Sequence, residues 1–152
     1  MKYNIAVIGL GYVGLPLAVE FGKKFNTVGF DVNQDRINEL ISGYDNTGEV
    51  SKRHLSSSIK LKFSSNKDDI INSDIYIIAV PTPIDNLNNP DLSILFSASE
   101  LVGSVLKKND IIIYESTVYP GCTEEVCVPI LEKHSHLKYN TDEAMHIIDF
   151  YH

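Results

Sequence analysis

The chain has 152 residues, of which 43% are hydrophobic and 22% are charged, a balance typical of an ordinary folded domain. Its formal charge of −7 argues against broad contact with nucleic acid or anionic lipid, because such contact needs clustered lysine and arginine side chains. The longest apolar runs, residues 75–81 and 111–114, are far shorter than the roughly 20 residues that span a bilayer. We therefore expect one domain that contacts neither nucleic acid nor a membrane.

The N-terminus and the two cysteines indicate the compartment. Residues 1–14 lack the small-residue cleavage site of a signal peptide and pass directly into a predicted strand and turn. Cys122 and Cys127 fit neither a disulfide framework nor a zinc ribbon. We expect both to pack as small hydrophobic side chains, and we expect the protein to be cytoplasmic.

Short β-rich apolar blocks alternate with segments of helical spacing, a pattern typical of βαβ units around a parallel sheet. The predicted strands are residues 4–8, 27–30, 60–63, 75–80 and 111–114. The predicted helices are residues 13–24, 34–41, 67–72, 92–107 and 123–131, with a weaker signal at 51–57. Asn33 and Asp91 precede the second and fourth of these helices and offer side-chain oxygens as caps. Residues 83–91 are predicted to form a surface loop of the kind that often borders a ligand.

A glycine-rich turn follows the first predicted strand. Gly9, Gly11 and Gly14 form the pattern GxGxxG there, at the start of the first helix. In that context Gly9 permits a tight turn, Gly11 lets the backbone approach a pyrophosphate, and Gly14 allows close packing of helix and strand. The N–H groups from Tyr12 to Gly14 and the helix dipole supply a local positive field. The chain is therefore predicted to be an α/β protein, a Rossmann-type doubly wound, mainly parallel sheet in a single domain.

Asp31 ends the second predicted strand, 22 residues after Gly9. In a dinucleotide-binding fold a carboxylate at this place accepts hydrogen bonds from the adenosine ribose and repels a 2′-phosphate, which favours NAD over NADP. Arg36 lies nearby, and an arginine there can accommodate that phosphate, so NADP stays open. Two alternatives stay open: the glycine turn has only a structural role, or Asp31 is only a turn residue.

Four longer segments carry a resemblance to a known family. They are VIGLGYVGLPLA (residues 7–18), VGFDVNQDRI (28–37), AVPTP (79–83) and STVYPGCTEE (116–125). In order and spacing they resemble the UDP-glucose/GDP-mannose dehydrogenase family. The chain most resembles the bacterial branch that acts on UDP-N-acetylhexosamines, or their uronate relatives, in capsule and surface polysaccharide synthesis. The resemblance covers about residues 3–133 and implies an NAD-binding domain over residues 1–132.

The resemblance also implies a set of cofactor-binding residues. They are Gly9, Gly11, Tyr12, Val13, Gly14, Asp31, Arg36, Thr82 and Thr117. Tyr12 and Val13 would meet the pyrophosphate through their backbone, and Arg36 would lie near the adenine. Thr82 and Thr117 follow the fourth and fifth predicted strands, the second of them near the nicotinamide. Parallel sheets bind ligands at that edge, but a hydrogen bond to neighbouring loop backbone is an alternative role for each threonine.

The family's reaction needs residues that the resemblance places beyond position 152. It is a double NAD-dependent oxidation of a sugar C6 alcohol to a carboxylate, with a cysteine nucleophile assisted by lysine and aspartate. Cys122 lies in PGCTEE, where the family motif has a threonine, so we expect it to cap the next helix. We assign no catalytic residue in this chain. A UDP-sugar substrate and a homodimer are expected only in the full-length enzyme.

The last 20 residues differ from the rest. Residues 133–152 hold four of the five histidines and contain no predicted strand, and EAMHIIDFYH (143–152) does not resemble the family. We interpret them as a divergent tail produced by truncation or a change of frame. The irregular spacing of these histidines argues against a metal site.

Two other functions fit parts of the pattern. The first is a non-catalytic nucleotide-sensing Rossmann regulatory module, which needs no cysteine nucleophile but has no stated need for AVPTP and STVYPG. The second is a complete small oxidoreductase of the hydroxyacid type. Such an enzyme needs a second domain that closes over the substrate and excludes water, and this sequence shows none, which argues against the second hypothesis.

Overall fold

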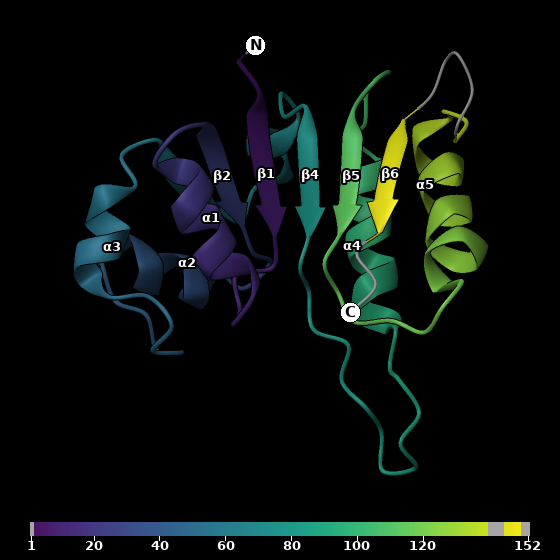
Figure 1. The fold of residues 1–152 in the computed structure, drawn as a ribbon, viewed down its shortest axis with the longest axis horizontal. Coiled ribbons are helices and arrows are strands. Elements are labelled where there is room, and N and C mark those ends of the chain that lie inside the picture. The colour runs from purple at the N-terminus through teal and green to yellow at the C-terminus, as the bar shows by residue number, and fades with distance from the viewer. Residues whose placement is uncertain (1, 140–144, 150–152) are drawn as a thin grey trace.

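Across the described residues, the sheet contains six parallel strands in the order β3-β2-β1-β4-β5-β6, and Figure 1 shows β2, β1, β4, β5 and β6 side by side. The computed structural model describes residues 2–139 and 145–149. The strands are β1 (Asn4–Ile8), β2 (Asn26–Phe30), β3 (Leu61–Ser64), β4 (Ile75–Ile78), β5 (Ile111–Tyr114) and β6 (His146–Asp149). Ile8 of β1 pairs with Phe30 of β2 on one side and Ile78 of β4 on the other. The predicted doubly wound sheet is confirmed.

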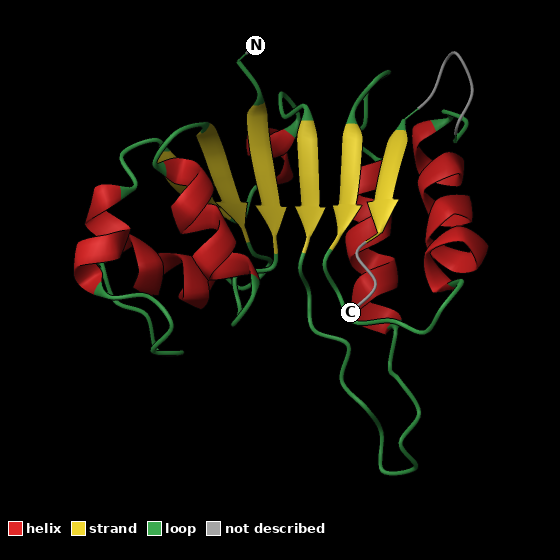
Figure 2. Ribbon diagram, viewed as in Figure 1, coloured by secondary structure: helices red, strands yellow, loops and turns green. Residues whose placement is uncertain are grey.

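Helices cover both faces of this sheet (Figure 2). They are α1 (Gly14–Gly22), α2 (Gln34–Ile41), α3 (Lys52–Ser57), α4 (Ser93–Gly103) and α5 (Val128–Ser135), with a 3₁₀ helix η1 (Lys67–Ile70) and a π-helix η2 (Thr123–Cys127). The Asn33 side chain caps α2 as predicted, by accepting from Asp35 N and Arg36 N. Within the described ranges, no helix is long and apolar enough to cross a membrane.

Alternating side chains of the strands build two separate cores. In β1, Ile5 and Val7 join a cluster with α1 and α2, whereas Ala6 and Ile8 join a second cluster with α4 and α5. All four side chains are at most 3% exposed. A parallel strand buried on both faces needs such a continuous apolar run, which is why the sequence signal for β1 is strong.

The helix predicted at residues 123–131 is two elements. Residues 123–127 form η2, in which Val128 N donates to the Thr123 carbonyl, and α5 follows with Pro129 in its first turn. Proline cannot donate to the carbonyl four residues earlier, and its ring clashes with that carbonyl. The α-helical ladder is therefore interrupted, and the predicted cap is also wrong, because the Cys122 side chain makes no capping hydrogen bond.

The expectation that residues 133–152 contain no strand is wrong. β6 pairs in parallel with β5 at the edge of the sheet, with Ile147 opposite Ile112. Met145, just before it, is fully buried in the core on the side of α4 and α5. The segment His-Ile-Ile-Asp is too short to signal a strand locally, and its pairing with β5 is a tertiary effect. His152 lies outside the described residues.

Candidate functional site

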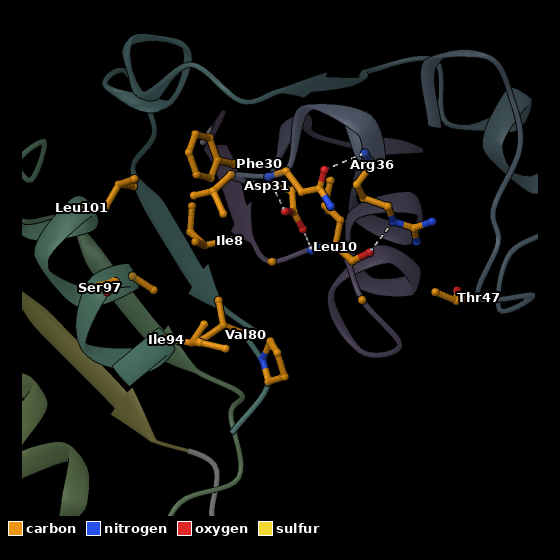
Figure 3. Close-up of a pocket in the computed structure, with 16 residues that line it drawn as sticks. Ile8, Leu10, Phe30, Asp31, Arg36, Thr47, Val80, Ile94, Ser97 and Leu101 are labelled. Atoms are coloured by element: carbon orange, nitrogen blue, oxygen red, sulfur yellow. Dashed lines mark hydrogen bonds between the residues drawn. The ribbon is translucent and has the colours of Figure 1, made fainter. Parts of the chain in front are cut away.

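A cleft of about 500 Å³ opens at the carboxyl ends of β1, β2 and β4 (Figure 3). Its wall includes Gly9 to Gly11 after β1, Asp31 after β2, and Val80 after β4. The chain leaves β1 toward α1 on one face, and it leaves β4 toward α4 on the other face. This divergence is the topological switch point at which open α/β sheets bind ligands.

The three glycines of the turn have three different environments. Gly9 has a φ of +92°, and a Cβ there would lie 3.0 Å from the Ala79 carbonyl oxygen. A Cβ on Gly14 would lie 1.7 Å from the Gly9 carbonyl oxygen, so only glycine lets α1 approach the turn this closely. A Cβ on Gly11 would meet no atom within 4 Å. Gly9 and Gly14 are therefore required by the fold, whereas Gly11 leaves open space beside the cleft.

The N-terminus of α1 is arranged to receive an anion. Val13 occupies its N-cap position and makes no side-chain capping hydrogen bond. Tyr12 and Val13, the two residues before α1, are 69% and 50% exposed. The N–H groups of an uncapped helix start and the helix dipole favour a phosphate. Tyr12 and Val13 do not line the cleft itself, and their predicted pyrophosphate contacts stay predictions.

Asp31 presents its carboxylate to the cleft in a fixed orientation (Figure 3). One oxygen accepts from Leu10 N at 3.0 Å and the other accepts from Asn33 N at 2.9 Å. Each carboxylate oxygen has capacity for a further hydrogen bond. Two fixed, adjacent acceptors match the two neighbouring hydroxyls of a ribose.

The guanidinium of Arg36 lies in a buried network, although the residue lines the cleft. Nε donates to the Leu10 carbonyl at 3.0 Å, and Nη2 donates to Asp45 at 2.8 Å. Nη1 donates to Asn46 at 3.0 Å and also to the Glu39 carboxylate. The family resemblance predicts Arg36 near the adenine, but no local pattern in the sequence connects a loop aspartate such as Asp45 to this arginine.

The remaining wall of the cleft is mostly apolar. It comprises Ile8, Phe30, Val32, Val80, Pro81, Ile94, Ala98 and Leu101, with the Ser97 side chain among them. The apolar α4 members, Ile94, Ala98 and Leu101, lie three or four residues apart, which is one face of a helix. That spacing is visible in the sequence, but which face of α4 meets the cleft is decided by packing. Such a wall suits the flat, weakly polar ring of an adenine.

The sequence model described as "UDP-glucose/GDP-mannose dehydrogenase family, NAD binding domain" matches residues 3–148. The chain belongs to this family. The match extends beyond residue 133 and includes most of β6, so the expectation that residues 143–152 do not resemble the family is wrong for residues 143–148. The cofactor of this domain is NAD, and the open space at Gly11, the start of α1 and the Asp31 carboxylate fit it.

Individual relatives agree with this assignment. The chain is 59% identical over 139 residues to UDP-N-acetyl-D-glucosamine 6-dehydrogenase of Pseudomonas aeruginosa. This match covers 91% of the chain and 33% of that protein. It is 54% identical over 142 residues to Protein CapL of Staphylococcus aureus, covering 93% of the chain and 33% of that protein. The solved UDP-D-ManNAc dehydrogenase of Pyrococcus horikoshii superposes with a TM-score of 0.87 at 34% identity, over 96% of the chain and 35% of that structure. The chain thus spans about a third of these relatives.

Thr82 and Thr117 are brought together at the same edge of the sheet. The Thr82 hydroxyl donates to the Thr117 carbonyl at 2.7 Å, which joins the loops after β4 and β5. Ser116 joins the same loops by donating to the Val80 carbonyl at 2.7 Å. Neither threonine lines the cleft itself. The backbone contact considered as an alternative is therefore present for Thr82, and the predicted NAD contacts of both threonines stay predictions.

Proposed function

We propose that this chain is the NAD-binding part of a dehydrogenase that oxidises the C6 alcohol of a UDP-N-acetylhexosamine to a carboxylate, for surface polysaccharide synthesis. The names of the two bacterial relatives support the substrate class and the link to capsule. The observation that carries the proposal is the cleft at the switch point, which Gly11 and Asp31 line, with α1 beginning three residues after Gly11.

The residues of this chain would bind and orient the cofactor. NAD supplies the hydride acceptor when it is bound. The N–H groups at Tyr12 and Val13 would hold the pyrophosphate, and Asp31 would hold the adenosine ribose. That placement directs the other half of the dinucleotide along the sheet edge toward Thr82 and Thr117. These two residues, on loops joined by their hydrogen bond, would contact the nicotinamide side.

The nucleophile of the reaction would be supplied by another part of the enzyme. Cys122 and Cys127 are both 0% exposed, and burial raises the pKa of the Cys127 thiol to about 12. A buried thiol with a raised pKa is a poor nucleophile, because the thiolate is the reactive form. We propose that the catalytic cysteine, lysine and aspartate, the UDP-sugar site and a homodimer interface belong to the two thirds of the enzyme that this chain does not cover. We also propose that the enzyme acts in the cytoplasm.

Two experiments test this function. Isothermal titration of the chain should show saturable NAD binding, while a mixture of the chain, NAD and UDP-N-acetylglucosamine should produce no reduced cofactor. Fusion of residues 1–148 to the remaining two thirds of the Pseudomonas aeruginosa relative should restore cofactor reduction with that sugar nucleotide. A folded chain that binds no NAD at millimolar concentration would contradict cofactor binding. A folded, NAD-binding fusion that reduces no cofactor with UDP-N-acetylglucosamine would contradict the role of this chain as the cofactor-binding part of such a dehydrogenase.

A further inference from the structure

A buried carboxylate in the loop after α2 determines where the Arg36 guanidinium lies. The Asp45 side chain has no exposed surface, and it accepts from Arg36 Nη2 at 2.8 Å. It also accepts from Val50 N at 2.9 Å, and from the N–H and hydroxyl of Thr47 at 3.0 and 2.7 Å. Asp45 therefore organises the loop of residues 43–50 and anchors Arg36 to it.

This carboxylate stays ionised at all physiological pH values. Burial alone would raise the pKa of Asp45, but the hydrogen bonds from Thr47, Val50 and Arg36 outweigh burial and lower it to about 2. A buried, ionised carboxylate attracts a guanidinium more strongly than an exposed one does, because little water screens the pair. The Arg36 guanidinium is thus held firmly inside the network.

The same network reaches the glycine-rich turn. Both polar groups of Leu10 are clamped, since its N–H donates to Asp31 and its carbonyl accepts from Arg36 Nε. Leu10 lies between Gly9 and Gly11, and glycines leave a backbone free to take many conformations. Fixing Leu10 therefore fixes the turn that would receive the pyrophosphate. Thr47, whose hydroxyl donates a hydrogen bond to Asp45, lines the cleft as well.

We propose that Asp45 is a positioning residue that sets the cofactor preference. It holds the Arg36 guanidinium against the Leu10 carbonyl, which shapes the turn for NAD and withholds that guanidinium from the 2′-phosphate of NADP. An arginine on this side of a dinucleotide cleft is the group that accommodates a 2′-phosphate. The preference then has two sources, repulsion by Asp31 and sequestration of Arg36. This inference rests on the NAD binding described above.

The test compares NAD and NADP affinities of the chain by isothermal titration. In Asp45→Asn, the affinity for NAD should fall by about threefold to tenfold, because Arg36 is held less firmly and its hydrogen bond to the Leu10 carbonyl weakens. The affinity for NADP should stay level or rise, so that the preference for NAD shrinks by at least about threefold. Glu49→Gln is the matched control, since it removes one negative charge from an exposed position of the same loop. Its two affinities should equal those of the unaltered chain.

Two further variants make the result specific. Adding Arg36→Met to Asp45→Asn should abolish the relative gain for NADP, because the released guanidinium is then absent. Glu39→Gln weakens the hold on Nη1 but leaves Asp45 intact, and it should shift the preference in the same direction by a smaller factor. It also provides the test if Asp45→Asn does not fold. Equal losses for both dinucleotides in the folded single variants would overturn the inference. Absence of NAD binding by the unaltered chain would instead overturn the proposed function.

Discussion

Two crevices of similar size lie at opposite ends of the sheet. The cleft at the carboxyl ends of the strands has a volume of about 500 Å³, and a second crevice near the amino ends of β1, β2 and β3 has about 430 Å³. The second is lined by Asn4, Ile5, Asn26, Thr27, Val28, Ile59, Lys60, Lys62, Asp69, Asn72 and Ser73. Volume therefore does not separate the cofactor cleft from the other hollow.

The chemistry of the two ends does separate them. At the amino end, polar side chains bind one another or nearby backbone: Asn26 donates to Asn4 at 3.2 Å, and Lys60 donates to the Lys24 carbonyl at 2.8 Å. At the carboxyl end, α1 begins without a side-chain cap, and Asp31 offers two fixed acceptors. The direction of the parallel strands puts helix N-termini at one edge only, and this decides where an anionic dinucleotide binds.

Gly11→Val should have the largest effect on the carboxyl edge. A Cβ at Gly11 meets no atom within 4 Å, so the fold should tolerate the change, but the side chain would fill the space that the pyrophosphate needs. Loss of two charge-assisted hydrogen bonds predicts a decrease in NAD affinity of at least about 100-fold. Isothermal titration measures the affinity and a thermal melt checks the fold. Near-normal affinity in the folded variant would mean that the pyrophosphate lies elsewhere.

The buried carboxylates Asp45 and Asp110 should give opposite pH dependences of stability. The pKa of Asp45 falls from an ordinary 3.8 to about 2, so Asp45 contributes about 2 kcal/mol that is present above pH 4 and lost as the pH falls toward 2. Burial raises the pKa of Asp110, the residue before β5, despite hydrogen bonds from Lys107. Its contribution is present below its unfolded pKa and lost as the pH rises through its folded pKa.

Urea unfolding at neutral pH and near pH 3 measures this contrast. Relative to the unaltered chain, Asp45→Asn should be more destabilised at neutral pH than at acid pH. Asp110→Asn should show the reverse. Identical pH profiles for the two variants would contradict the assignment of opposite environments to these carboxylates.

Asp31→Asn should weaken NAD binding by about tenfold, because a neutral amide accepts weaker hydrogen bonds from the ribose and offers one acceptor where the carboxylate offers two. Asp35→Asn serves as the control, since Asp35 is an exposed carboxylate on α2 close to the same edge. Titration with NAD should show little change for the control. An equal loss in both variants would assign the effect to general charge and not to ribose recognition.

Lys60→Ala combined with Lys62→Ala should have the smallest effect. Both lysines line the crevice at the amino end, which on this account takes no part in dinucleotide binding. We expect the NAD affinity to change by less than about twofold, the range of an indirect surface effect. A larger loss, measured by the same titration, would show that the two ends are not functionally distinct.

Local rules in the sequence predicted the part of the site that depends on backbone geometry. Gly9 and Gly14 have the conformation and close approach that GxGxxG requires, and Asp31 lies at the end of β2 as its register indicated. These features could be predicted because turn geometry and the spacing of one βαβ unit depend on neighbouring residues.

Features that depend on packing between distant segments were not predicted. Asp45 meets Arg36 only because the loop after α2 folds back on that helix. β6 is fixed by its pairing with β5, and Thr82 meets Thr117 across 35 residues. The π-helix η2 had a local signal in Pro129, which lies within the segment predicted as one helix.

The most direct test of the account is a titration of the isotopically labelled chain with NAD, followed by NMR of the backbone amides. We predict saturable shifts for Leu10 to Gly14 and for Asp31 to Asn33, and little change for Asn26 and Lys60 at the other end of the sheet. Shifts concentrated at Asn26 and Lys60, or a folded chain whose amides do not respond to millimolar NAD, would contradict the placement of the cofactor at the carboxyl edge.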